Sequence, residues 1–345
     1  MTETQVARPG GVDFDGFGLV ALRPLVARGI EAAFPLSPGD RILVTAGQAV
    51  ARDTLLAERL RDARTIVVPA FEVAAGRDQP GDRWTPPSSR RTGEAASEEG
   101  ELLFQSGDRW RIGTGDVIES LVAPFAGIVT EVRPGIGLRL RTPSPAVLGD
   151  TVFGGPSSGR LQVVTGADGE VRAPEVDVGA AGAILVAGAA IDAEALTRAR
   201  AVGIRGVVVA TLGVKERRDF LASERRGQAG AHGLPPFAIL VLEGAVRRPI
   251  ASPTMAILEA LAGRTVAIVD DPPSLVLDDP EAVLPLPPPG FVRVRAGPLI
   301  GAEGTWAGLA GPRRFPAGIT LEAGLIRLGG RPPVAVPLGD LERFD

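Results

Sequence analysis

The 345-residue sequence lacks cysteine, tyrosine and asparagine, and it has one histidine, His232, and one lysine, Lys215. The absence of cysteine excludes disulfides, thiolate nucleophiles and zinc–thiolate sites, and one imidazole cannot build a multi-histidine metal site. The side chains that most often perform catalysis are therefore scarce. The composition favours a non-enzymatic protein with no metal and no catalytic residue, and leaves an enzyme as the alternative.

The charge balance also limits the binding partners. The sequence has 37 basic and 41 acidic residues and a formal net charge of −4, so a protein whose whole surface binds nucleic acid or anionic lipid is not expected. The apolar stretch over residues 16–35 is interrupted by Arg23, Arg28 and Glu31 and is not expected to cross a bilayer. No signal peptide is evident at the N-terminus. We expect a soluble, cytoplasmic protein without membrane contact.

Two segments poor in regular apolar patterns divide the chain, whose length suggests more than one domain. Residues 73–108 are rich in Gly, Pro, Ser, Arg and Glu, which predicts a mobile insertion. Residues 271–290 are rich in proline, which predicts an extended linker whose Leu and Val residues can lie against a neighbouring domain. The resulting organisation is a β-rich region over 1–178, an α/β domain over 179–270, the linker, and a β barrel over 291–345.

The α/β pattern is clearest between residues 179 and 270. Four short apolar runs, typical of strands buried on both faces, lie at 183–187, 206–210, 237–242 and 265–269. Helix signals separate them, including Asp192 as an N-cap with Gly203 at the end of the helix, and Ser252-Pro253 before MAILEALA. Strands that alternate with helices predict a doubly wound parallel sheet.

Ligands of open parallel sheets bind beyond the carboxyl ends of the strands. This rule predicts a pocket for a small ligand, such as a nucleotide or a carboxylate, where small residues leave room and helix N-termini can hold an anion. The alternative is that the glycines only form tight turns between strands and helices. The predicted edge consists of Gly188, Ala189, Thr211, Leu212, Gly213, Glu243 and Gly244.

Two segments of the N-terminal region share a pattern of turn glycines. The first, residues 35–58, contains Gly39-Asp40 and Gly47-Gln48, and the second, residues 115–135, contains Ala123-Pro124, Gly127 and Val129. These segments resemble the two flanks of a biotinyl/lipoyl-type domain, the barrel-sandwich hybrid. In that family, a tight hairpin between the flanks bears the modified lysine.

The residues between the two flanks depart from that family. They form the long polar insertion at 73–108, which contains no lysine. Covalent biotin or lipoate is therefore not expected, and we expect no other cofactor. The resemblance then implies a barrel that serves as a docking or spacer module.

The C-terminal region alternates apolar and basic residues in FVRVR and then places Gly297, Gly301 and Gly304 at spacings of four and three. This segment resembles the KOW motif of small SH3-like barrels, with Gly329–Gly330 as a hairpin turn. In that family, the loops of the barrel contact RNA or a protein partner such as the polymerase or the ribosome. The resemblance therefore implies a partner in transcription or translation.

Arginines beside stacking aromatics are the side chains that RNA binding requires. Residues 291–345 contain seven Arg against five Asp or Glu, which is a small excess for an RNA-binding module. We therefore favour a protein partner or a purely structural role over RNA, and Trp306 can instead fill the barrel core. The candidate surface consists of Arg293, Arg295, Trp306, Arg313, Arg314 and Phe315.

Other motifs do not indicate a catalytic site. Residues 155–159 match the letters of a G-x-S-x-G nucleophile elbow, but a strand-like segment follows where the elbow requires a helix. No phosphate-binding loop precedes Lys215. Our hypothesis from the sequence is a multidomain docking or scaffold protein, and the alternative is a ligand-binding regulator or an enzyme that acts at the carboxyl edge of the α/β sheet.

Overall fold

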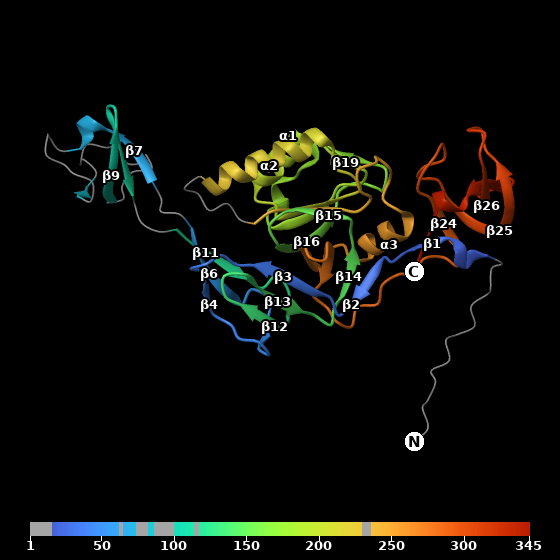
Figure 1. Ribbon diagram of the computed structural model, residues 1–345, viewed down its shortest axis with the longest axis horizontal. Helices are drawn as coiled ribbons and strands as arrows, with labels where there is room; N and C mark the ends of the chain where they lie inside the picture. Colours follow the sequence, from blue (N-terminus) through green and yellow to red (C-terminus); the bar gives the residue numbers. More distant parts are fainter. Residues whose placement is uncertain (1–15, 62–64, 74–81, 86–99, 114–116, 230–235) are drawn as a thin grey trace, which may run out of the picture. The chain divides into compact units, whose positions relative to one another are not determined.

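The computed structural model describes residues 16–61, 65–73, 82–85, 100–113, 117–229 and 236–345 (Figure 1). It is sheet-rich, with 44% strand and 16% helix, and it includes a sheet that curls into a half-barrel. The chain divides into two compact units. The first contains Met1–Ala32, Thr142–Leu221 and Pro236–Asp345, and the second contains Ala33–Arg141 and Ala222–Pro235. None of the helices in the described part of the chain has the length and apolarity that a membrane crossing requires.

A nine-stranded sheet forms the centre of the first unit. Its order is β15 (Thr151–Gly154), β21 (Ala238–Val241), β20 (Gly206–Val209), β18 (Ala183–Val186), β16 (Ser157–Val163), β22 (Thr265–Val269), β23 (Ser274–Leu277), β14 (Pro145–Leu148) and β2 (Val26–Arg28). Four neighbouring strands, β21, β20, β18 and β16, are parallel to one another. The other neighbouring strands of the sheet pair in the antiparallel direction.

Helices cover both faces of this sheet (Figure 1). Successive side chains of a strand point to opposite faces, so Ile184 of β18 packs in one core and Leu185 in the other. The helices α1 (Ala193–Val202) and α2 (Val214–Ala229) pack on the Leu185 side, and α3 (Ser252–Ala260) packs on the Ile184 side.

The ends of α1 follow the sequence signals. The side chain of Asp192 accepts a hydrogen bond of 2.6 Å from the amide of Ala195, and the helix ends at Gly203 with a φ of 89°. A two-stranded sheet of β17 (Glu170–Val171) and β19 (Ala190–Ile191) precedes α1. Two short 3₁₀ helices, η3 (Ala173–Glu175) and η4 (Val178–Ala180), lie in the same region of the chain.

The central sheet differs from the prediction in three ways. Four of its strands, β2, β14, β15 and β16, come from the range 1–178 that the sequence assigned to a separate β-rich region. The fourth predicted strand, β22, is antiparallel and pairs with β16 and β23 instead of extending the parallel set. An apolar run shows that a strand is buried but does not show its direction. Ser274–Leu277, which we predicted as part of the linker at 271–290, is the buried strand β23 between β22 and β14. Its four apolar or small residues outweigh the flanking prolines.

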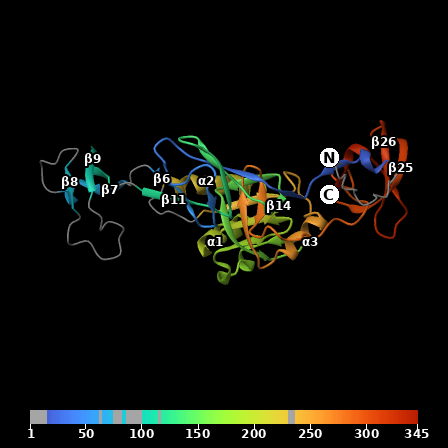
Figure 2. The same cartoon turned by 90° about the horizontal axis from the view of Figure 1, so that it is seen from below.

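A six-stranded sheet contains most of the C-terminal residues. Its core consists of Val20, Val292, Val294, Trp306, Ile326, Val336 and Leu341. Its order is β1 (Ala21–Arg23), β28 (Leu341–Phe344), β24 (Phe291–Val294), β25 (Glu303–Arg314), β26 (Thr320–Arg327) and β27 (Val334–Pro337), and β25 and β26 lie side by side in both views (Figures 1 and 2). The strand β1 comes from outside the predicted range of 291–345 and pairs in parallel with β28. The 3₁₀ helices η1 (Phe17–Leu19) and η5 (Leu338–Asp340) accompany this sheet.

The second unit contains three small sheets. One has the order β3 (Glu31–Pro35), β13 (Gly137–Arg141), β12 (Gly127–Arg133) and β5 (Ala49–Val50), and another has β11 (Val117–Val122), β6 (Leu55–Arg61) and β4 (Arg41–Ile42). The two flanks that carry the biotinyl/lipoyl resemblance are paired, because the amide of Gly47 donates to the carbonyl of Val129 at 2.7 Å and β5 pairs with β12.

The third sheet includes part of the predicted mobile insertion. Its order is β7 (Thr65–Pro69), β10 (Arg109–Gly113), β9 (Gly100–Ser106) and β8 (Arg83–Trp84), with η2 (Ala70–Glu72) after β7. Residues 74–81 and 86–99 of the insertion lie outside the described residues. The described parts are folded because the apolar side chains of Trp84 and Leu102 are buried with Val68, Trp110 and Ile112.

Candidate functional site

The predicted ligand edge lies where the sequence places it, directly after β18, β20 and β21. However, most of its side chains and backbone groups already have partners within the chain. The amide of Ala189 donates to the carbonyl of Gly169 at 2.7 Å, and the hydroxyl of Thr211 donates to the carbonyl of Val246 at 3.0 Å. A Cβ atom added to Gly188 would clash with the carbonyl oxygen of Gly166. Near Gly188, the small residues accommodate close approach of the backbone instead of leaving room for an anion.

The remaining edge residues differ in exposure. Ala189 and Leu212 are buried with Thr211, whereas Gly213 is exposed beside Glu216 of α2. Gly244 is half-buried and lies near Asp150. Glu243 is buried, and it takes part in a cluster of charged side chains.

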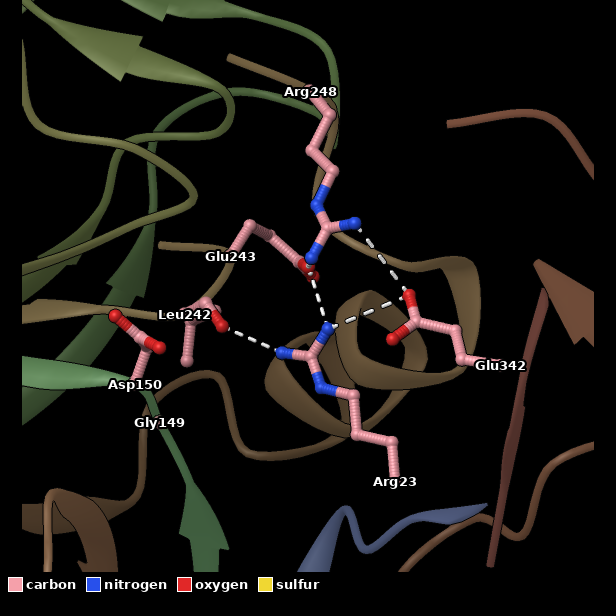
Figure 3. Close-up of a pocket in the computed structure, with 7 residues that line it drawn as sticks. All are labelled: Arg23, Gly149, Asp150, Leu242, Glu243, Arg248 and Glu342. Atoms are coloured by element: carbon pink, nitrogen blue, oxygen red, sulfur yellow. Dashed lines mark hydrogen bonds and ion pairs between the residues drawn. The ribbon is translucent and has the colours of Figure 1, made fainter. Parts of the chain in front are cut away.

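The charged cluster consists of Arg23, Glu243, Arg248, Arg293 and Glu342, and Figure 3 shows all of these residues except Arg293. These residues come from β1, the end of β21, the loop before α3, β24 and β28. The Glu243 carboxylate pairs with Arg23 Nη1 at 2.7 Å, with Arg248 Nη2 at 3.1 Å and with Arg293 Nη2 at 2.5 Å. The Glu342 carboxylate pairs with Arg293 Nη2 at 2.6 Å and with Arg248 Nη1 at 3.6 Å. The cluster therefore links the central sheet to the C-terminal sheet.

Backbone groups complete the coordination of the cluster. The amide of Ala251, which precedes α3, donates to Glu243 Oε1 at 3.1 Å. Arg23 Nη2 donates to the carbonyl of Leu242 at 2.5 Å. The carboxylate of Glu243 thus accepts hydrogen bonds from two guanidinium groups and one amide, and it forms an ion pair with a third guanidinium group. These are the partners that a buried carboxylate needs.

The electrostatics of the cluster favour the ionised form of Glu243. Burial raises the pKa of Glu243, but hydrogen bonds and charge from Arg293 and Arg23 outweigh it and lower the pKa to about 2. Burial lowers the pKa of Arg293, but the hydrogen bond and charges of Glu243 and Glu342 raise it to a net value above its ordinary one. A carboxylate held ionised in this way is a poor general base near neutral pH, because its pKa lies far below the working pH.

A pocket of about 220 Å³ lies beside the cluster, lined by Arg23, Gly149, Asp150, Leu242, Glu243, Arg248 and Glu342 (Figure 3). Glu243 is the member of the predicted edge that lines it. The charged groups of the cluster are directed at one another across the two sheets. Within the described residues, no group of three or more His, Asp or Glu side chains is placed to hold a metal ion. The arrangement suits a structural link more than a binding site.

The low pKa of Glu243 predicts a loss of stability in acid. A pKa lowered from 4.5 to about 2 stabilises the folded state by about 3 kcal/mol above pH 5. This contribution is lost as the pH falls toward 2, because the unfolded chain takes up the proton first. The difference in unfolding free energy between the wild type and Glu243→Gln should therefore shrink by about 2 kcal/mol between about pH 6 and pH 3. Urea unfolding at each pH measures it, and a difference independent of pH would contradict the assignment.

Two of the six residues of the predicted partner surface are buried, and the other four are accessible. Arg293 is 1% exposed and belongs to the charged cluster, and Trp306 is 6% exposed in the core of the C-terminal sheet. Neither side chain can contact a partner on the folded protein, so these two predictions are wrong. The alternation of apolar and basic residues in β24 predicted that its arginines face solvent. Instead, all four side chains of β24 are buried, because Arg293 faces the central sheet and pairs with Glu243.

The other four residues of that surface remain accessible. Arg295, Arg313 and Arg314 are exposed, and Phe315 is half-buried. Arg295 donates from Nε to the carbonyl of Gly339 at 3.1 Å. Arg313 and Arg314 end β25, and Phe315 follows at the turn into β26. Arg313, Arg314 and Phe315 therefore form a smaller surface than predicted at the end of the β25–β26 hairpin, and Arg295 lies apart from them in the chain, after β24.

Sequence analysis missed three members of the cluster, namely Arg23, Arg248 and Glu342. No local motif marks them, since Arg23 and Glu243 are 220 positions apart in the chain. The remaining signal is a buried Arg or Glu within an apolar strand, which requires a partner of opposite charge. That signal does not identify the partner.

Comparisons with known proteins give no family. The chain matches no protein-family model, and no curated protein has a matching sequence.

Proposed function

We propose that this chain is a non-catalytic docking protein that binds a protein partner through the end of the β25–β26 hairpin. The observation that carries the proposal is the extent of this hairpin. Strand β24 pairs with β25 only over Glu303–Thr305, and β27 pairs with β26 over Ala323–Ile326. Beyond these positions, β25 and β26 continue to pair as far as Arg314 and Thr320.

Residues 312–322, the hairpin tip, therefore form a two-stranded ribbon. A ribbon of this kind gains little stability from its own strands. It nonetheless exposes Arg313, Arg314 and Leu321, and Ile319 is 52% exposed. Arginine is enriched at protein interfaces, and branched aliphatic side chains supply the apolar area.

The charge of the hairpin tip indicates the kind of partner. The hairpin tip contains two basic residues, Arg313 and Arg314, and one acidic residue, Glu322, so its net charge is positive. An acidic protein surface would complement this charge and would pair with arginines at the rim of the contact. The resemblance to KOW-type barrels makes proteins of the transcription and translation machinery the first partners to test.

Reversing the charge of the two arginines should weaken docking. We expect Arg313→Glu/Arg314→Glu to reduce capture of the partner about tenfold or more, because two attractive charges become repulsive. Affinity capture from nuclease-treated cells of the source organism, followed by binding of the purified captured protein, measures the loss. The matched control is Arg217→Glu/Arg331→Glu, which makes the same charge change at two exposed arginines outside the hairpin tip.

Two outcomes would overturn the protein-docking proposal. One is equal capture by both double variants. The other comes from a parallel capture without nuclease: retention of RNA instead of protein, lost from Arg313→Glu/Arg314→Glu and falling steeply with salt concentration as phosphate contacts require.

The alternative function is binding of a nucleotide or carboxylate at the carboxyl edge of the central sheet. The pocket beside Glu243 is the observation in its favour. Against it, the arginines that would bind an anion are already paired with Glu243 and Glu342. A ligand would have to displace these buried ion pairs, which is costly.

A further inference from the structure

The proline-rich segment before β24 is held in place at both ends. Residues 282–288 lie in neither a helix nor a strand. At the first end, Arg28 donates from Nη1 to the carbonyl of Pro280 at 2.9 Å and from Nη2 to the carbonyl of Ala282 at 2.8 Å. At the second end, the amide of Phe291 donates to the carbonyl of Pro288 at 3.1 Å. The segment is therefore fixed against the first unit.

The exposure of this segment has a period of three residues. Val283 is 92% exposed, Leu286 is 85% exposed, and Pro289 is also exposed. Between them, Leu284 and Pro287 are half-buried, and Leu284 packs on the core of the central sheet. A polyproline II helix has three residues per turn, so residues i and i+3 share one edge. One edge of such a helix faces the protein, and two edges face solvent.

The exposed edges carry the features of a polyproline ligand. The edge of Val283, Leu286 and Pro289 is apolar, and the neighbouring edge places Pro285 and Pro288 at the spacing of a PxxP motif. Proline has no amide donor and little conformational freedom to lose, so a partner can bind the ridge at a small entropic cost. Leucine and valine side chains this exposed otherwise cost free energy in water.

We propose that this proline-rich ridge, residues 283–289, is a second docking surface that binds a protein domain with an aromatic-lined groove. Grooves of this class accept polyproline II ligands by packing prolines and an aliphatic side chain between aromatic rings. Acidic residues precede the ridge, and Glu281 is exposed. The groove should therefore have basic side chains at the end that meets Glu281. The proposal goes beyond docking through the hairpin tip and does not depend on it.

The test uses the full chain and three purified probes, an SH3, a WW and an EVH1 domain. Calorimetric titration should detect binding of the wild type to at least one of them. Leu286→Asp should weaken that binding about tenfold or more, because it removes one buried leucine from the contact. Pro285→Ala/Pro288→Ala should weaken it too, since the ridge loses its fixed conformation. Circular dichroism checks that each variant remains folded.

The control is Val178→Asp, which places the same charge at an exposed apolar residue outside the ridge. It should bind as the wild type does. The variant Arg313→Glu/Arg314→Glu should also bind the probes normally, which separates this proposal from docking by the hairpin tip. Failure of all three probes to bind the wild type, or equal binding by Leu286→Asp, would overturn the proposal.

Discussion

Replacing Glu243 by alanine is expected to lower the free energy of unfolding by about 3–5 kcal/mol, because it leaves Arg23, Arg248 and Arg293 buried or half-buried without their shared carboxylate. Removing one partner of a buried ion pair costs more than the pair contributes, since the remaining charge is neither solvated nor neutralised. Urea unfolding followed by circular dichroism measures the change.

The matched control for this prediction is Asp150→Ala. Asp150 lines the same pocket but is exposed, so its loss should change the free energy of unfolding by less than about 0.5 kcal/mol. If Glu243→Ala were as stable as the wild type, the charged cluster would not hold the two sheets together. A binding role for Glu243 would then become the better explanation.

Trp306→Ala is expected to cost about 3–5 kcal/mol, as large-to-small substitutions in well-packed cores do. The indole is 6% exposed, packs with Val292, Ile326 and Leu341, and lies with its ring centroid 6.0 Å from that of Phe17. Thermal and urea unfolding of the variant measure the loss. Trp306→Phe keeps most of the apolar area and should cost clearly less than Trp306→Ala.

A binding role for Trp306 makes the opposite prediction. In that case Trp306→Ala would leave the unfolding free energy unchanged and would weaken partner or RNA binding. The same experiment therefore tests whether this aromatic belongs to the core or to the interface.

Three of the four parallel strands of the central sheet could be predicted from the sequence because their signals are local, whereas β16 lies outside the predicted α/β domain. Continuous apolar runs mark the strands β18, β20 and β21, and Asp192 and Gly203 mark the ends of α1. Each signal depends on residues within a few positions of one another. The same local reasoning places Gly188, Thr211 and Glu243 after the ends of their strands.

Features that depend on contacts between distant segments could not be predicted. Strand β1 pairs with β28 across more than 300 positions, and β22 lies beside β16 in an antiparallel direction. The strand β23 was not predicted because it lies in a proline-rich segment, and its burial depends on neighbours from other segments of the chain. The alternation in FVRVR indicated one exposed face, whereas the central sheet covers it and pairs Arg293 with Glu243.

The biotinyl/lipoyl and KOW resemblances remain predictions. The pairing of β5 with β12 brings the two N-terminal flanks together, and β26 and β27 flank the predicted turn at Gly329–Gly330. Short turn motifs of this kind occur in many small barrels, so they do not by themselves distinguish one barrel family from another.

Hydrogen exchange of the full chain, with and without the purified captured partner, tests the docking account most directly. If the partner docks on the hairpin tip, its binding should slow exchange of the backbone amides of residues 312–322 and leave the amides around Asp150 and Glu243 unchanged. Slower exchange at Asp150, Glu243 and Arg248, with none in the hairpin tip, would contradict docking on the tip and would place the binding site at the carboxyl edge of the central sheet.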